Sequence, residues 1–167
     1  MNLVHGHLLL NHFPIIGAFI GLGILLVGIW KKNETLLNTA AYLLFIIAAI
    51  TIPAFYTGEP AEEAIEHLSG ISHKLIHEHE EAAELAFYVM LLNGALAFGF
   101  IIMNRIKMPI AKRMPMVLLV ITAITCLLMA RAGFEGGKIR HSEIIENTSV
   151  ISAESPNNNE EHNEDHH

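Results

Sequence analysis

The sequence predicts an all-α fold, a four-helix transmembrane bundle, and two observations support this prediction. Of the 167 residues, 52% are hydrophobic and only 16% are charged, whereas a soluble domain usually carries about 25% charge. The charges are also unevenly placed, because four stretches contain no Asp, Glu, Lys or Arg: 1–30, 35–58, 85–104 and 114–130. Three of these stretches hold the roughly 20 apolar residues that a helix needs to cross a bilayer, and the fourth falls within the usual range.

The four spans follow one another with short connections, except between the second and the third. We expect them at about 8–30, 36–57, 82–103 and 115–132, within one transmembrane domain over 1–146. They must be helices, because in hydrocarbon every backbone polar group has to be paired within its own segment. The single cysteine, Cys126, lies in an apolar stretch, which excludes a disulfide framework and a four-cysteine zinc site.

The orientation follows from the basic residues in the short loops. The loops after the first and third spans hold six of the ten Lys and Arg residues, so they are expected on the cytoplasmic side of a bacterial inner membrane. Both termini then lie outside, on the periplasmic side, and all eleven histidines lie on that side with them. The net charge of −7 argues against nucleic acid as a partner and leaves the lipid bilayer as the expected one.

Two segments outside the spans are acidic. The second loop has Gly58 and Pro60 at its start, which predicts a short extramembrane helix, and Glu59 and Glu63 belong to its row of acids three or four residues apart. Like charges at this spacing repel one another, so a cation or a basic partner is expected to neutralise them. The segment 147–167 lacks apolar periodicity and is expected to be a disordered, acidic, histidine-containing tail.

Two histidines are the strongest candidates for a ligand inside or near the membrane. His12 lies one or two turns inside the first span, and an intramembrane histidine either binds something or hydrogen-bonds a neighbour. His79 begins a stripe of small and polar residues that faces the bundle interior through the third span, whereas His77 and Glu81 belong to a rim face. The alternative for the rim face is a solvated helix start, whose acids the helix dipole favours.

The segment after the fourth span carries further polar residues. Gly136 and Gly137 are expected to break the helix, so that the backbone folds back over the mouth of the bundle. Arg140 and His141 would then lie at the outer surface. Arg140 is expected either to form a salt bridge with an acid of the second loop or to clamp a haem propionate.

Other motifs indicate packing. Gly17 and Gly21 permit close approach of helices. We expect several small or polar residues of the third and fourth spans to be core: Met90, Thr122, Thr125, Cys126 and Met129.

Four motifs together resemble an uncharacterised family of bacterial four-span integral membrane proteins, a domain of unknown function. They are His-Leu-Leu-Leu-Asn-His-Phe-Pro at 7–14, Thr-Gly-Glu-Pro-Ala-Glu-Glu at 57–63, His-Glu-His-Glu-Glu at 77–81 and Gly-Gly-Lys-Ile-Arg-His-Ser-Glu at 136–143. The resemblance covers about 2–143 and implies the same four-span fold. It supplies no activity, and a kinship with small haem b membrane proteins is an analogy of fold and histidine placement.

Three hypotheses follow for the function, and an electron-transfer or binding protein is favoured over an enzyme. The first is a haem b-binding electron-transfer protein with His12 and His79 as axial ligands, Arg140 near the propionates, and a periplasmic or membrane redox partner. The second is a protein that binds, senses or transports a divalent metal ion. The third is a structural or assembly subunit of a membrane complex. The candidate metal ligands are His7, His12, His77, His79, His141, Glu59, Glu63 and Glu81.

Overall fold

The computed structural model describes residues 3–58 and 73–153, with side chains over 10–58 and 73–138. The described residues form four long α-helices and one short 3-10 helix. They are α1 (Leu3–Trp30), α2 (Glu34–Tyr56), α4 (His73–Arg105), η1 (Pro109–Lys112) and α5 (Met114–Ala153).

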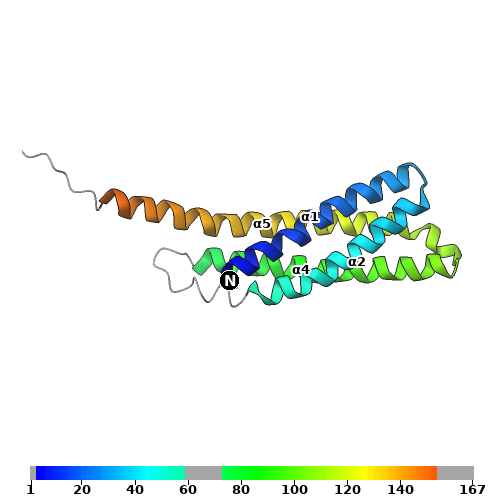
Figure 1. Cartoon of the computed structure of the whole chain (residues 1–167), viewed down its shortest axis with the longest axis horizontal. Helices are drawn as coiled ribbons and strands as arrows, with labels where there is room; N and C mark the ends of the chain where they lie inside the picture. Colours follow the sequence, from blue (N-terminus) through cyan, green and yellow to red (C-terminus); the bar gives the residue numbers. More distant parts are fainter. Residues whose placement is uncertain (1–2, 59–72, 154–167) are drawn as a thin grey trace, which may run out of the picture.

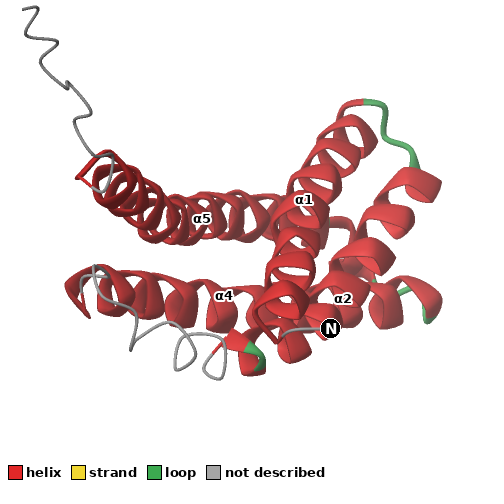
Figure 2. Ribbon diagram, turned by 60° about the vertical axis from the view of Figure 1, so that its left-hand side comes forward, coloured by secondary structure: helices red, strands yellow, loops and turns green. Residues whose placement is uncertain are grey.

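The four helices form an elongated bundle (Figure 1). Helix α1 packs on α2 and α5, and α4 also packs on α2 and α5, so α1 and α4 lie diagonally across the bundle. The connections between α1 and α2 and between α4 and α5 lie at one end, which we call the inner end (Figure 1). The beginnings of α1 and α4 and the last turns of α5 lie at the opposite, outer end (Figures 1 and 2). The all-α, four-helix architecture is therefore confirmed.

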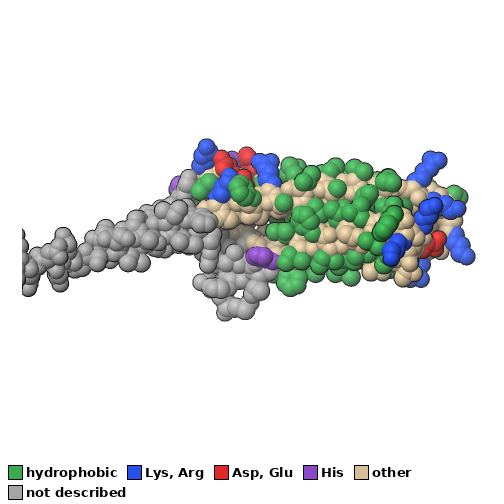
Figure 3. All heavy atoms as spheres, turned by 90° about the horizontal axis from the view of Figure 1, so that it is seen from above, with side chains coloured by type: hydrophobic (Ala, Val, Ile, Leu, Met, Phe, Trp, Pro, Cys, Tyr) green, Lys and Arg blue, Asp and Glu red, His purple; other side chains and the backbone are tan. Residues whose placement is uncertain are grey.

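Each of the four long helices is long and apolar enough to cross a membrane. The qualifying segments are Leu10–Trp30, Glu34–Tyr56, His73–Arg105 and Met114–Lys138, which contain or overlap the four predicted spans. Hydrophobic side chains cover the middle of the bundle, and Lys and Arg side chains gather towards its ends (Figure 3). Large apolar side chains such as Phe19 and Leu127 are exposed on this surface. A surface of this kind suits lipid, so the chain is an integral membrane protein.

Glycines hold the helices close together in the core, as expected. Gly17 and Gly21 of α1 are buried against Ile47 and Leu44 of α2, and a side chain at either glycine would overlap its neighbour. A Cβ at Gly94 of α4 would overlap the Cβ of Ala48 on α2. These contacts are the small-residue packing that membrane helices use in place of a hydrophobic driving force.

The interior of α4 and α5 confirms the predicted core residues of these two helices. The expected core residues Met90, Thr122, Thr125, Cys126 and Met129 are all buried, and so are Ala86, Asn93 and Ala97 of the small-residue stripe. Asn93 accepts a hydrogen bond of 3.1 Å from the Thr122 hydroxyl across the α4–α5 interface. Phe87, which the sequence places on a flank of that stripe, is also buried, because its ring stacks on Phe55 of α2 at 4.2 Å between centroids.

Helix α5 corrects the prediction for the segment after the fourth span. The expectation that Gly136 and Gly137 break the helix is wrong, because α5 continues without interruption from Met114 to Ala153. Glycine costs only about 1 kcal/mol relative to alanine inside a helix, which a tertiary contact can offset. Arg140 and His141 therefore continue along the α5 axis and do not fold back over the mouth of the bundle. Residues 147–153 of the predicted disordered tail also belong to α5, and 154–167 lie outside the described residues.

Helix α4 is also longer than its predicted span, since it begins at His73 and not near residue 82. At 1.5 Å per residue, its 33 residues extend about 50 Å and the 40 of α5 about 60 Å. The hydrocarbon core is about 30 Å thick. The first turns of α4 and the last turns of α5 therefore project together beyond the bilayer at the outer end. The short helix predicted in the second loop lies outside the described residues.

Candidate functional site at the outer end

The imidazole of His79 lies in the interface between α4 and α5. Its Nδ1 is 3.0 Å from the backbone carbonyl oxygen of Ala132, and the side chain is partly buried. A carbonyl oxygen can only accept a hydrogen bond, so Nδ1 carries a proton and donates the hydrogen bond. The neutral ring then has its lone pair on Nε2. This arrangement is the one found for ligand histidines, whose second nitrogen donates to a carbonyl or carboxylate that fixes the ring.

Gly136 of α5 provides the space for this ring. A Cβ at Gly136 would lie 3.0 Å from Cε1 and 3.3 Å from Nδ1 of His79. These separations are shorter than ordinary carbon contacts, so a side chain there would displace the imidazole. At the neighbouring Gly137 a Cβ would meet nothing within 4 Å. The ring of His79 therefore explains why glycine is found at 136, whereas no contact among the described residues explains the glycine at 137.

The start of α1 reaches the same depth as His79. Ile15 of α1 approaches Gly133 of α5, where a Cβ would lie 3.3 Å from the Ile15 side chain. The ring of His79 contacts α5 at Ala132 and Gly136, within one turn of that level. One turn outward from Ile15 along α1 brings Asn11 and His12 to this level, because four residues rise about 6 Å.

Helix α1 presents Asn11, and not His12, to the interior. The His12 side chain is exposed, whereas Asn11 is half-buried and its Oδ1 is buried without a hydrogen-bond partner. A buried acceptor without a donor is rare and calls for an explanation. Position 7 lies four residues before Asn11 and seven residues before Pro14, which is buried. Residues four and seven apart share one face of a helix. By helical register, position 7 therefore belongs to the same face of α1 as Asn11 and Pro14.

His77 points away from the interface. It is 70% exposed, and its Nε2 lies 3.3 Å from Oε1 of Glu81, while its Nδ1 lies 3.7 Å from Oε2 of Glu80. Both acids are also exposed and belong to the same helix. The structure thus brings the two predicted residues His77 and Glu81 together, as an exposed pair within one helix.

For the remaining candidate residues, the structure gives either the position in a helix without the side chain, or no position. Position 140 is four residues after Gly136 and continues the inner face of α5, whereas position 141 lies on the same face as Phe134 and Gly137, which are exposed. The side chains of His7, Arg140 and His141 lie outside the described part of the chain, and so do Glu59 and Glu63 altogether.

Among the described residues, no group of three or more His, Cys, Asp and Glu side chains could hold a metal ion. Sequence reasoning identified His79 through the small-residue stripe, but it missed the carbonyl of Ala132 and the role of Gly136. The close contact between Gly136 and the His79 imidazole cannot be predicted from the sequence of either helix alone.

Comparison with protein-family models, with curated proteins and with solved structures gave no match.

Proposed function

We propose that this integral membrane protein binds haem b at its outer end and carries electrons there, with His79 as one axial ligand. The hydrogen bond from His79 Nδ1 to the Ala132 carbonyl is the observation that supports this most directly. It fixes the ring plane and, in the neutral ring, places the proton on Nδ1, so that Nε2 has the lone pair that binds iron.

A haem is the occupant that best suits a single oriented imidazole. The porphyrin fills four positions of the iron, so the protein has to supply only one or two ligands. A bare divalent ion needs three or four protein ligands in one place. His79 by itself therefore fits a haem site better than an isolated metal site.

The exposed side chain of His12 makes this residue a poor candidate for the second axial ligand. We assign this role to His7, because position 7 lies on the face of α1 that Asn11 and Pro14 turn inward, whereas His12 is exposed. The orphan Oδ1 of Asn11 supports the choice. This oxygen lies at the same end of the bundle and can accept a hydrogen bond from the N–H of a ligand imidazole. It would then act on that imidazole as the Ala132 carbonyl acts on His79. Arg140, on the inner face of α5, is proposed to pair with a propionate.

When bound, haem b supplies a one-electron couple whose potential depends on axial ligands, hydrogen bonds and burial. The residues of this chain contribute the rest. His79 and His7 would hold the iron, the Ala132 carbonyl would set the basicity of His79, and the apolar faces of the helices would keep water from the site.

The test is an absorption spectrum with metal analysis of the same full-length protein, purified in detergent from haem-replete cells. We expect a Soret band that His79→Ala and His7→Ala abolish. The matched controls are His77→Ala, two residues from His79 on the exposed face, and His12→Ala, on the exposed face of α1. Both should keep the band.

Three results would overturn parts of this proposal. Colourless wild-type protein with a stoichiometric divalent ion would favour metal binding, and colourless protein without metal would favour a structural or assembly subunit. Loss of the band in His12→Ala but not in His7→Ala would restore His12 as the second ligand. To separate ligation from folding, imidazole added to His79→Gly should restore the band.

A further inference from the structure

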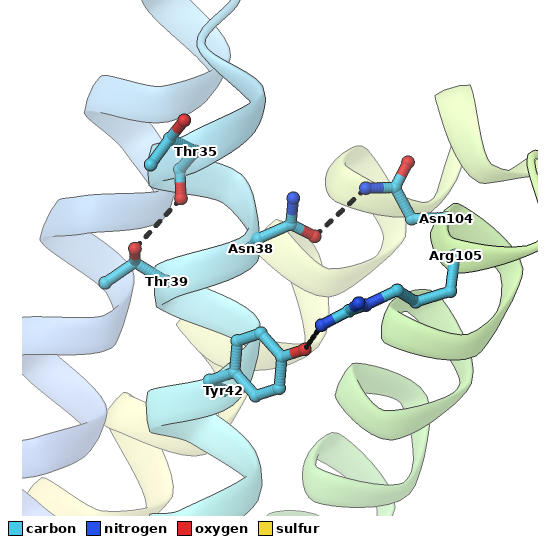
Figure 4. Close-up of a pocket in the computed structure, with 6 residues that line it drawn as sticks. All are labelled: Thr35, Asn38, Thr39, Tyr42, Asn104 and Arg105. Atoms are coloured by element: carbon cyan, nitrogen blue, oxygen red, sulfur yellow. Dashed lines mark hydrogen bonds between the residues drawn. The ribbon is translucent and has the colours of Figure 1, made fainter.

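A polar hollow of about 350 Å³ lies at the inner end, between the first turns of α2 and the last turn of α4. We call it the inner hollow. It is far from His79 along the bundle axis and independent of the haem proposal. Its lining residues are Thr35, Asn38, Thr39, Tyr42, Asn104 and Arg105 (Figure 4).

Among the residues that the structure describes, Arg105 is the only charged one that lines the inner hollow, and one neighbour holds it in place. A guanidinium N–H donates to the Tyr42 hydroxyl at 3.1 Å, which ties the last turn of α4 to α2 (Figure 4). No described carboxylate lies within ion-pair distance of Arg105. A guanidinium has five N–H donors in a planar fork that matches phosphate oxygens, and Tyr42 uses one of them.

Amide and hydroxyl groups complete the wall. The Asn104 amide donates to Oδ1 of Asn38 at 3.0 Å, and the Asn38 amide nitrogen points away from that bond (Figure 4). The Thr39 hydroxyl donates to the backbone carbonyl of Thr35 at 2.9 Å. The hollow therefore combines the Arg105 guanidinium with the amide N–H groups of Asn38 and Asn104 that the bond between these two residues does not use, whereas the Thr39 hydroxyl proton is already bonded. A cation beside neutral N–H donors suits an anionic oxyacid.

The surroundings of the inner hollow are strongly cationic. The inner end carries Lys31, Lys32, Arg105, Lys107, Lys112 and Arg113 against the single acid Glu34, six positive charges against one negative. By the positive-inside rule this end faces the cytoplasm, whose leaflet is rich in anionic lipid.

An apolar track leads from the hollow towards the middle of the membrane. Phe45 of α2 stacks on Phe98 of α4 at 5.1 Å between ring centroids, and both rings are partly exposed. Ile102, one turn before the end of α4, is also exposed. A free phosphate ester without acyl chains would make no contact with this apolar track, whereas the acyl chains of a lipid would pack along it.

We propose that the inner hollow binds the phosphate of an anionic phospholipid, with Arg105 as its main contact and the acyl chains along the Phe45–Phe98 track. Basic pockets between transmembrane helices on the cytoplasmic side bind such headgroups. Tyr42 is a positioning residue, because it acts by holding the guanidinium.

The experiment uses the full-length protein in phosphatidylcholine vesicles that contain spin-labelled phosphatidylglycerol or, in parallel, spin-labelled phosphatidylcholine. Electron paramagnetic resonance gives the relative association of the two lipids with the protein. We expect a preference for phosphatidylglycerol that Arg105→Gln lowers about fivefold.

Arg113→Gln is the matched control, since it removes the same charge from the same end outside the hollow, and it should change the preference by less than about twofold. Equal losses in the two variants would mean a diffuse electrostatic effect and would overturn the site. Tyr42→Phe should cause an intermediate loss with the helical circular dichroism unchanged, and no loss would overturn its positioning role. Displacement of the lipid by soluble glycerol 3-phosphate would show a site for free phosphate esters and overturn the lipid assignment.

Discussion

The two ends of the bundle differ in where glycine and lysine are found. At the inner end lysine has the left-handed conformation that glycine usually adopts, and at the outer end glycine lies inside a helix that it usually ends. At the inner end, α1 and α4 are each followed, two residues after their last helical residue, by a lysine in the left-handed region, Lys32 at φ 49° and Lys107 at φ 54°. Asn33 and Met108 then donate to the carbonyls of Gly28 and Met103 five residues back, which closes each helix. At the outer end, Gly133, Gly136 and Gly137 stay inside α5, which continues to Ala153.

The difference shows that other requirements override local backbone preference at both ends. Glycine is the usual residue for a left-handed helix end, and lysine there costs about 1 kcal/mol. The orientation expected from the sequence depends on positive charge in these two loops, which offers a reason to keep the lysines. Inside α5, a glycine costs about as much relative to alanine, but Gly136 makes room for the His79 ring.

The largest expected effect comes from filling the space beside His79. Gly136→Val should destabilise the protein by about 1–3 kcal/mol, because the new side chain overlaps the imidazole. It should also abolish the proposed haem band, since the ring would leave the Ala132 carbonyl. The free energy of unfolding in mixed detergent–dodecyl sulfate micelles and the absorption spectrum measure the two effects.

Gly137→Ala is the matched control for that variant. A Cβ at Gly137 meets nothing within 4 Å, so alanine there should stabilise α5 by about 0.5–1 kcal/mol through helix propensity alone. If Gly136→Val and Gly137→Ala shifted stability in the same direction, the contact with His79 would not be the reason for glycine at 136.

The next effect lies at the inner end and should have the opposite sign. Lys32→Gly should stabilise the protein by up to about 1 kcal/mol, because glycine adopts the left-handed conformation without strain. Lys31→Gly removes the same charge from a residue that is not in that region, and it should bring no such gain. The same unfolding measurement distinguishes them, and equal shifts would mean that charge, and not backbone strain, governs this turn.

The sequence predicts the fold well because its signals are local. Uncharged stretches of about 20 residues define the spans, and the Gly17–Gly21 spacing indicates which face of α1 packs. The site is harder to predict, because it depends on rotation about a helix axis and on contacts between helices. The sequence favours His12 as the ligand from the first span, and only the burial of Asn11 and Pro14 shows which face of α1 turns inward.

The continuation of α5 through its glycines could not be inferred for the same reason. A Gly-Gly pair is a common stop signal, and nothing nearby in the sequence indicates that a ring from α4, 57 residues earlier, occupies the space at Gly136. The buried position of Phe87 likewise depends on Phe55 of another helix. Long-range contacts of this kind decide the site, whereas composition decides the class of fold.

The smallest expected effect concerns the third glycine of the outer end, and it tests how far packing explains the whole run. A Cβ at Gly133 would lie 3.3 Å from Cδ1 of Ile15, the end of a flexible side chain that can turn aside. Gly133→Ala should therefore change the free energy of unfolding by less than about 0.5 kcal/mol, because the gain in helix propensity and the cost of moving Ile15 nearly cancel. In an Ile15→Val background the terminal methyl is absent, so the same substitution should become stabilising by up to about 1 kcal/mol. If it stayed neutral in both backgrounds, the approach of α1 to α5 at this level would not be the reason for a glycine at 133.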